Sequence, residues 1–186
     1  MDYQVLGVLM EQKDIVFLPY VRIDGIPTLR DSEILALWDR AEKEGWVDQL
    51  FHDGNISNRV QFLQYIISPG TLFFVCYFKG DICGFFWLNR LEITHAYCHF
   101  AFFKKYWNRK VNIPIGKAAM RMLFSSSKLN FELILGMLPG SNTRAIQYAK
   151  NVGFKFVGKI PNLLFSAKEG KPVEGILVQL SKKDLQ

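Results

Sequence analysis

A strand–helix–strand unit near the C-terminal end is the feature that most constrains the fold of this chain. The apolar run over residues 133–137 predicts a short strand, residues 142–152 predict a helix, and Phe154 begins a second strand. Asn142 suits the capping position at the start of the helix, and Gly153 suits the left-handed turn that ends it. Many α/β proteins contain such a unit, so the order of the elements around it decides the fold class.

The elements before this unit follow from hydrophobic period and turn residues. Apolar residues recur at helical spacing over residues 32–44, and a second helix is expected between a cap at Ser57 and the breaking run Ser68-Pro69-Gly70. Continuous apolar runs on both sides of Lys79-Gly80-Asp81 predict a hairpin. The expected order is strands 3–10 and 15–20, helices 32–44 and 58–67, strands 72–78, 82–89 and 96–103, a helix from Pro114 or Ile115 to Phe124, strand 131–137, helix 142–152, and strands 154–159 and 174–180.

Length and composition favour one globular domain over residues 1–186. The chain is 49% hydrophobic and 22% charged, and it contains no internal repeat or low-complexity linker. Its 16 Phe residues predict an aromatic-rich interior or an apolar surface reserved for a partner.

Charge and cysteine content narrow the class of protein further. The net charge of +6 is compatible with anionic ligands, a phosphorylated cofactor or nucleic acid, or with an ordinary basic surface. No block of five or six like charges occurs, so a nucleic-acid-binding arm is not expected. Three cysteines without a CxxC pair favour free thiols in a reducing compartment. No signal peptide or membrane-spanning run is recognised, which predicts a cytoplasmic protein without membrane contact.

The spacing of five residues carries a resemblance to a known family. Asn142, Ala145 and Ile146 are followed by Gly153 and Phe154, eleven and twelve residues after the Asn. This pattern resembles the last conserved block of the GCN5-related N-acetyltransferases (GNATs), and the resemblance is strongest over residues 71–160. It implies an α/β (α+β) fold with a mixed central sheet of about six or seven strands and about four helices. It also implies acetyl-CoA as cofactor and direct attack of a primary amine on the thioester in a ternary complex.

The resemblance assigns the pantetheine arm of the cofactor to three residues. In the family, two neighbouring parallel strands splay apart and expose main-chain groups to this arm. The main chain of Phe102 and Phe103 and the side-chain amide of Asn142 would take these positions here. Simple helix capping is the alternative role for Asn142.

The family's phosphate-binding turn is only partly present. It would fall at residues 111–118, where Gly116 matches, Ile115 precedes it, and Val111 and Pro114 depart from the pattern. Proline also removes a backbone donor. Five cations near this turn are expected to replace the missing donors, unless the turn has degenerated and they form a solvated surface: Lys104, Lys105, Arg109, Lys110 and Lys117.

Three residues are candidates for acid–base chemistry. Many family members place a Tyr general acid seven residues after the conserved Asn, but this chain has Ala149 there. Tyr148 lies one residue earlier, about 100° away around the helix, and either acts as the acid or packs in the core. His99 is a candidate base on the cofactor-side strand, or a histidine hydrogen-bonded within the sheet. Glu92 is a second candidate base or a solvated residue, and no metal site is expected.

Two other functions stay open at this point. The displaced Tyr and the glycine-poor turn are also compatible with a catalytically silent binding or assembly module, with or without bound CoA. A nucleic-acid-associated protein is the third and least favoured alternative. The acceptor amine, small molecule or protein, and the oligomeric state do not follow from the sequence.

Overall fold

The computed structural model describes residues 14–185, so the strand expected over residues 3–10 lies outside it. Its strands are β1 (Ile15–Tyr20), β2 (Arg22–Ile23), β3 (Ile26–Pro27), β4 (Leu72–Phe78), β5 (Asp81–Asn89), β6 (His95–Phe102), β7 (Leu133–Pro139), β8 (Lys155–Ser166) and β9 (Lys171–Ser181). Its helices are α1 (Asp31–Lys43), α2 (Val47–Leu50), α3 (Arg59–Ile66), α4 (Arg109–Ser125) and α5 (Thr143–Val152), with 3-10 turns at Lys104–Tyr106 and Lys182–Leu185.

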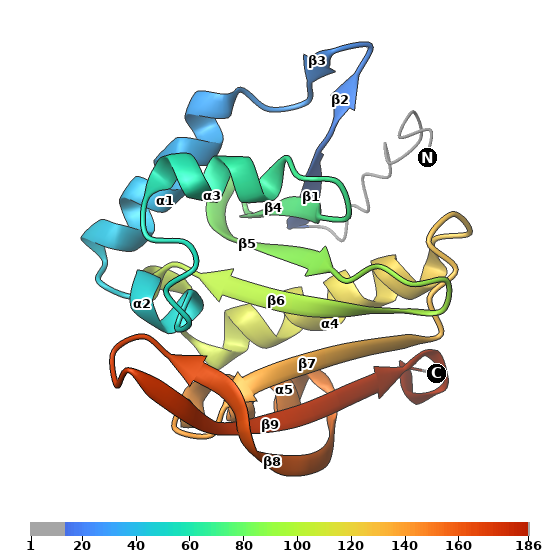
Figure 1. Cartoon of the computed structure of the whole chain (residues 1–186). Helices are drawn as coiled ribbons and strands as arrows, with labels where there is room; N and C mark the ends of the chain where they lie inside the picture. The colour runs from blue at the N-terminus through green and yellow to red at the C-terminus, as the bar shows by residue number, and fades with distance from the viewer. Residues whose placement is uncertain (1–13, 186) are drawn as a thin grey trace.

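Seven of these strands form one mixed sheet in the order β1-β4-β5-β6-β7-β9-β8. Neighbouring strands are antiparallel except β6 and β7, which are parallel. This parallel pair is joined only through residues 95–97 and 133–135, after which the two strands diverge (Figure 1). The expected mixed sheet of six or seven strands is therefore confirmed, and so is the expected gap between two parallel strands.

Helices cover both faces of the sheet and bury two aromatic layers. Helices α1 and α3 lie on one face, and α4 and α5 lie on the other (Figure 1). On the first face, Phe62 of α3 packs against Phe73 and Phe85. On the second, Phe74 stacks on Phe86 with ring centroids 4.7 Å apart. Side chains alternate between the faces of a strand, so the Phe-rich runs of β4 and β5 supply both layers.

The start of α4 differs from the prediction. The helix begins at Arg109, five residues before Pro114, because Asn108 caps it by accepting from the Lys110 N–H at 2.9 Å. Pro114 then lies inside the helix, where it leaves the Lys110 carbonyl without its helical donor. Lys110 is exposed, so solvent can satisfy this carbonyl. A similar one-residue difference occurs at α3, whose cap is Asn58 and not Ser57.

The last hairpin is longer than predicted. Strand β8 runs to Ser166 because its pairing with β9 continues past two register shifts, with Asn162 at a φ of 57°. As an edge strand it tolerates Pro161, which cannot donate to a neighbour. Several of its apolar side chains are exposed, including Phe156 and Phe165.

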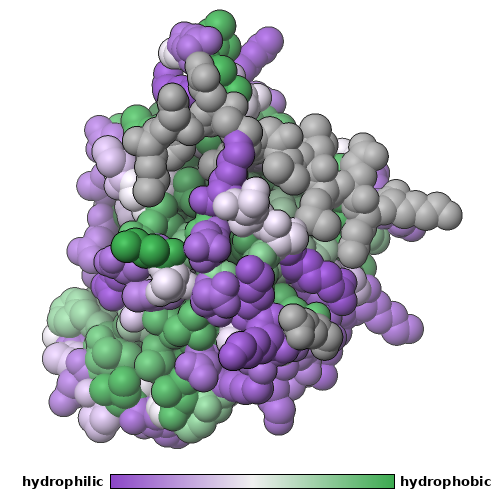
Figure 2. Space-filling model, turned by 90° about the vertical axis from the view of Figure 1, so that its right-hand side faces the viewer, coloured by the Kyte–Doolittle hydropathy of each residue, from purple (hydrophilic) through white to green (hydrophobic). Residues whose placement is uncertain are grey.

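Figure 2 shows hydrophilic and hydrophobic side chains mixed over the face it presents, with apolar groups gathered towards the lower left. None of the described helices combines the length and apolar character needed to cross a lipid bilayer.

Candidate active site

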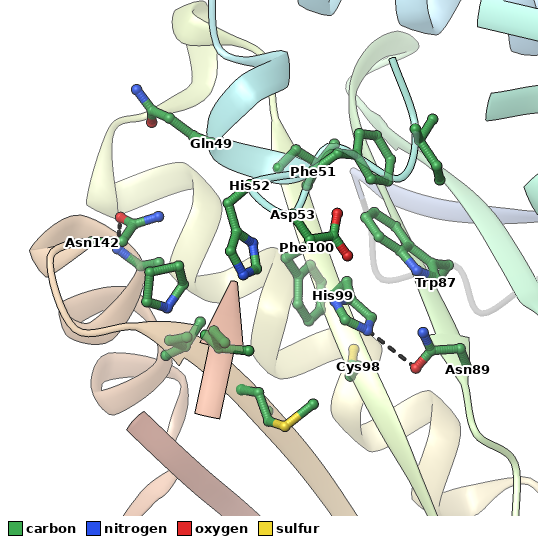
Figure 3. Close-up of a pocket in the computed structure, with 18 of the residues that line it drawn as sticks. Gln49, Phe51, His52, Asp53, Trp87, Asn89, Cys98, His99, Phe100 and Asn142 are labelled. Carbon is green, nitrogen blue, oxygen red and sulfur yellow. Dashed lines mark hydrogen bonds between the residues drawn. The ribbon is translucent and has the colours of Figure 1, made fainter. Parts of the chain in front are cut away.

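A cavity of about 820 Å³ passes through the gap between β6 and β7. Its lining comes from both faces of the sheet: β6, β7 and α5, the segment from α2 to residue 56, and β8 (Figure 3). A smaller cavity of about 130 Å³ adjoins β6, α4 and α5 and shares Phe100, Asn142 and Tyr148 with the first. The diverging strands thus create space that is lined by residues from both faces of the sheet.

Hydrogen bonding decides which main-chain groups of β6 face the gap. The Phe103 N–H donates to the Cys83 carbonyl at 3.1 Å, and the Phe103 carbonyl accepts from the Tyr106 N–H at 2.8 Å. Because successive residues of a strand direct these groups to opposite edges, Phe100 and Phe102 face the gap. The Phe102 carbonyl accepts from the indole of Trp107 at 2.7 Å, which leaves its N–H for a ligand. The prediction is therefore wrong for Phe103, whose main-chain groups are already paired and whose side chain is fully buried.

Asn142 performs the capping role and retains hydrogen-bonding capacity. Its Oδ1 accepts from the Ala145 N–H at 3.1 Å, the bond drawn at this residue in Figure 3. The side chain also lines both cavities. The amide nitrogen has two donors and engages neither with another described residue, so it can donate to a carbonyl in the gap.

The expected glycine turn is helical. Ile115 and Gly116 are buried inside α4, so their N–H groups cannot form a phosphate-binding nest, and this part of the prediction is wrong. A Cβ on Gly116 would lie 2.2 Å from the Tyr148 Oη and 2.7 Å from the Val152 Cγ2. Gly116 is therefore a packing residue that lets α4 and α5 approach each other closely.

The free N-terminus of α4 offers another site for anions. Arg109 and Lys110 are exposed in its first turn, where the helix dipole favours negative charge. Lys104 and Arg144 add two cations, whose charged groups lie 5.9 and 4.0 Å from the centre of the Trp107 ring. Sequence reasoning missed Arg144, because the contact depends on the packing of α5 beside the 3-10 turn at Lys104–Tyr106.

Two predicted cations do not belong to this cluster. Lys105 forms an ion pair with Asp81 at 3.0 Å, on an exposed surface. Lys117 lies eight residues into α4, about 12 Å along the axis from its first residue. The cations that gather near the start of α4 are therefore Lys104, Arg109, Lys110 and Arg144.

The Tyr148 hydroxyl, predicted as a general acid, packs against α4. Its hydroxyl is buried, has no hydrogen-bond partner among the described residues, and rests against Gly116. Burial raises the pKa of this hydroxyl well above its ordinary value. Ala149, at the position of the family's Tyr, lines the large cavity instead. This geometry contradicts the expected role of Tyr148 as a general acid and supports the alternative, core packing.

Replacing Tyr148 with Phe is expected to preserve the fold and raise the free energy of unfolding by about 1 kcal/mol, because it removes an unpartnered buried hydroxyl. Urea denaturation measures this change. Acetyl transfer, followed by thiol release from acetyl-CoA, should stay close to the wild-type rate. A rate loss greater than about tenfold would restore Tyr148 as a candidate acid.

His99 stands on the cavity wall in a defined tautomer. Tyr65 Oη accepts from Trp87 Nε1 and from Asn89 Nδ2, at 3.1 and 2.8 Å. The Asn89 Oδ1 is therefore the acceptor for His99 at 3.2 Å, so the His99 Nε2 carries the proton (Figure 3). The His99 ring stacks on Trp87 at 4.7 Å, and its Nδ1 keeps a lone pair for the cavity.

Burial lowers the pKa of His99 to about 4, with a further lowering by Arg90 and His52 and an opposing effect of Asp53. The imidazole is thus neutral at physiological pH. It presents a lone pair, and not a charge, to a ligand in the cavity.

This pKa predicts acid sensitivity of the fold. Between pH 6.5 and about 4, the unfolded chain binds a proton at His99 that the folded chain does not. The free energy of unfolding therefore falls as pH decreases through this range, by up to the order of 3 kcal/mol from His99 alone. Urea denaturation near pH 7 and pH 4.5 should show the wild type losing more stability than His99→Gln. Equal losses in the two proteins would contradict the assignment.

Glu92, a predicted base, lies outside both cavities. It is exposed in the turn between β5 and β6, where its N–H donates to the His95 carbonyl at 2.9 Å. This turn is at the paired end of β6, and Glu92 does not line either cavity. Its position contradicts a role as general base.

Two residues of the large cavity also escaped sequence reasoning. His52 and Asp53 follow α2 and line the large cavity (Figure 3). The run His52-Asp53-Gly54-Asn55 is rich in turn formers, and the only signal it offered was a polar turn between two helices. Within residues 14–185, no group of three or more His, Cys, Asp or Glu side chains could hold a metal ion.

Comparison with known proteins agrees with this geometry. Residues 27–171 match the family described as acetyltransferase (GNAT) domain. The chain therefore belongs to the GNAT family of acetyltransferases, which confirms the resemblance found in the sequence. No curated protein matches the chain.

Solved structures with the same fold are distant in sequence. Ribosomal-protein-S5-alanine acetyltransferase from Vibrio fischeri is 11% identical, with 96% of this chain and 99% of that chain covered and a TM-score of 0.71. Spermidine N-acetyltransferase from Vibrio cholerae, in complex with CoA and spermine, is 11% identical, with coverages of 92% and 98% and a TM-score of 0.70. The Microcin C7 self immunity acetyltransferase MccE, in complex with acetyl-CoA and AMP, is 11% identical, with coverages of 91% and 93% and a TM-score of 0.68. At these identities the likeness shows the fold alone.

Proposed function

We propose that this protein transfers an acetyl group from acetyl-CoA to a primary amine, which attacks the thioester directly while both substrates are bound. The observation that carries the proposal is the cavity through the gap between β6 and β7. Its lining comes from both faces of the sheet and includes His99, so two ligands bound on opposite faces could meet beside this residue. The complexes of two structurally similar acetyltransferases with CoA and with acetyl-CoA support this reading.

The unpaired groups of the gap fit the pantetheine arm of acetyl-CoA. The N–H of Phe102, the main chain of Phe100 and the free amide donors of Asn142 match the amides of this arm. Its phosphates would bind at the start of α4, where helix dipole and side-chain charge act together. Four cations are available there: Lys104, Arg109, Lys110 and Arg144.

His99 is the proposed base. When bound, acetyl-CoA supplies the activated acetyl thioester. The Nδ1 of His99 takes the proton that the amine nitrogen loses as its bond to the acetyl carbon forms, and the CoA thiolate leaves with the electrons of the C–S bond. Asn89 holds the His99 ring through Nε2 and thereby keeps Nδ1 directed to the cavity. The aromatic wall around Trp87 limits water beside the reacting atoms.

A silent binding module is the competing function, and two features favour it. Within the described chain, neither the glycine nest nor a Tyr at position 149 is present. Calorimetric titration with acetyl-CoA tests binding, and thiol release in the presence of primary amines tests transfer. Absence of binding at millimolar acetyl-CoA would overturn the proposal. Binding without transfer to any amine would favour the silent module.

A further inference from the structure

The charges around the large cavity are unequal in sign. Among the described residues that line it, Asp53 is the single carboxylate, while Arg90, His52 and His99 are the basic groups. We propose that Asp53 binds the ammonium group of the acceptor, and that the acceptor is a monoamine with a single positive charge and an apolar, aromatic-sized body. The bound ammonium first releases one proton to solvent, and the neutral amine then attacks the thioester and gives its second proton to His99. This inference rests on the proposed function and specifies the substrate class for that site.

Asp53 is held in position for such a contact. Its Oδ1 accepts from the Asn55 N–H at 3.2 Å, and its Oδ2 accepts from the Asn55 amide nitrogen at 2.7 Å. Each oxygen keeps a further lone pair, and the half-buried carboxylate lies near His52, His99 and Trp87 (Figure 3). Because Asp53 acts electrostatically on His99, an amine bound by Asp53 lies near the proposed base.

The cavity walls near Asp53 favour an acceptor with an apolar body. Phe51 stacks on Trp87 with ring centroids 5.8 Å apart, and Trp87 stacks on His99. Aromatic faces attract both apolar groups and ammonium ions. The apolar side chains that contribute to this part of the wall are Phe51, Tyr65, Trp87, Leu163 and Phe165.

The same charges disfavour a polyamine. Each ammonium taken from water needs a partner, and one carboxylate satisfies one ammonium. Arg90 and the net charge of +6 repel any further positive charge. The spermidine N-acetyltransferase from Vibrio cholerae is in complex with spermine, so the prediction separates this chain from a protein of similar fold.

The cavity is also closed on one side, which disfavours a long acceptor. The β8–β9 turn is attached to the loop after α2, since the Ala167 N–H donates to the His52 carbonyl at 2.8 Å. Gly54 permits this contact, because a Cβ there would lie 2.8 Å from the Ala167 Cβ. A compact amine fits such an enclosure better than an extended peptide.

The test compares acetylation of 2-phenylethylamine, spermidine and a short peptide with a free amino terminus, measured as thiol release with full-length protein. We expect kcat/KM for 2-phenylethylamine to exceed that for spermidine by about tenfold or more, because the extra charges of spermidine lack partners. Asp53→Asn should raise the KM for 2-phenylethylamine about tenfold, with little change in kcat or in acetyl-CoA affinity. Asp53→Glu, which keeps the charge, should recover most of this loss.

Asp48→Asn is the matched control, since Asp48 is an exposed acid in α2 outside the cavity lining. It should leave all three rates unchanged. Spermidine or the peptide acetylated as well as 2-phenylethylamine, or an unchanged KM in Asp53→Asn, would overturn the inference while the proposed function stands. Acetyl-CoA binding without transfer to any of the three amines overturns the inference as well. Failure of the wild type to bind acetyl-CoA overturns the proposed function itself.

Discussion

Replacement of His99 with Gln is expected to lower kcat for acetyl transfer by about a hundredfold or more, the usual contribution of a positioned general base. Gln can still hydrogen-bond to Asn89, so the wall of the cavity is preserved, but it has no basic nitrogen to receive the proton of the amine. The affinity for acetyl-CoA should change little, because the groups assigned to the cofactor lie on α4, α5 and the gap-facing edge of β6. Thiol release measures kcat, and calorimetry measures affinity.

His95 provides the matched control for this substitution. It lies on the same face of β6, four residues earlier, but at the end where β6 and β7 are paired and outside both cavities. His95→Gln should therefore leave kcat unchanged. A full rate in His99→Gln, or an equal loss in His95→Gln, would remove His99 from the mechanism.

Gly116→Ala is expected to destabilise the protein by about 2 kcal/mol, the typical cost of overpacking a filled interior. The added Cβ would lie 2.2 Å from the Tyr148 Oη and 2.7 Å from the Val152 Cγ2. Tyr148 has little room to move, because the edges of Phe100 and Phe102 enclose its ring at 5.6 and 5.5 Å. Ala is favoured over Gly inside a helix by about 1 kcal/mol, so a net loss of stability would report the clash itself.

Two companion variants make the stability measurement specific. Gly158→Ala adds the same methyl group where no atom lies within 4 Å, and it should change the free energy of unfolding by less than about 0.5 kcal/mol. Combining Gly116→Ala with Tyr148→Phe removes the nearest atom and should recover part of the loss. Urea denaturation of the four proteins would contradict the account if Gly116→Ala were as stable as the wild type.

Local sequence signals explain why much of the fold could be predicted. The α5 block was recognisable because Asn142 and Gly153 mark its two ends and the apolar spacing between them is helical. The β4–β5 hairpin was recognisable because Lys79-Gly80-Asp81 separates two apolar runs, and in the structure Lys79 and Gly80 adopt the positive φ of a tight turn. The apolar and aromatic run over residues 96–103 predicted the strand that bears His99. Each of these features depends on residues that are close in the chain.

The errors fell where local signals compete or are silent. Asn108 and Pro114 are both acceptable helix starts, and the earlier one prevailed, so Gly116 moved from an expected phosphate turn into the α4–α5 contact. The sequence does not distinguish whether the main-chain groups of Phe102 or those of Phe103 face the gap, because this depends on the pairing of β6 with β5. The sequence alone does not show towards which edge of a strand a residue directs its N–H and C=O groups.

The sequence by itself determined the family, the order of the elements and the strand that bears His99, because these follow from short-range patterns of cap, turn and period. The tertiary structure decided the chemistry around that strand. It turned Tyr148 towards Gly116, left the Phe102 N–H free, and carried Asp53 from a loop after α2 to the cavity beside His99. Contacts between residues far apart in the chain depend on how the helices and strands pack, and that packing exists only in the folded protein.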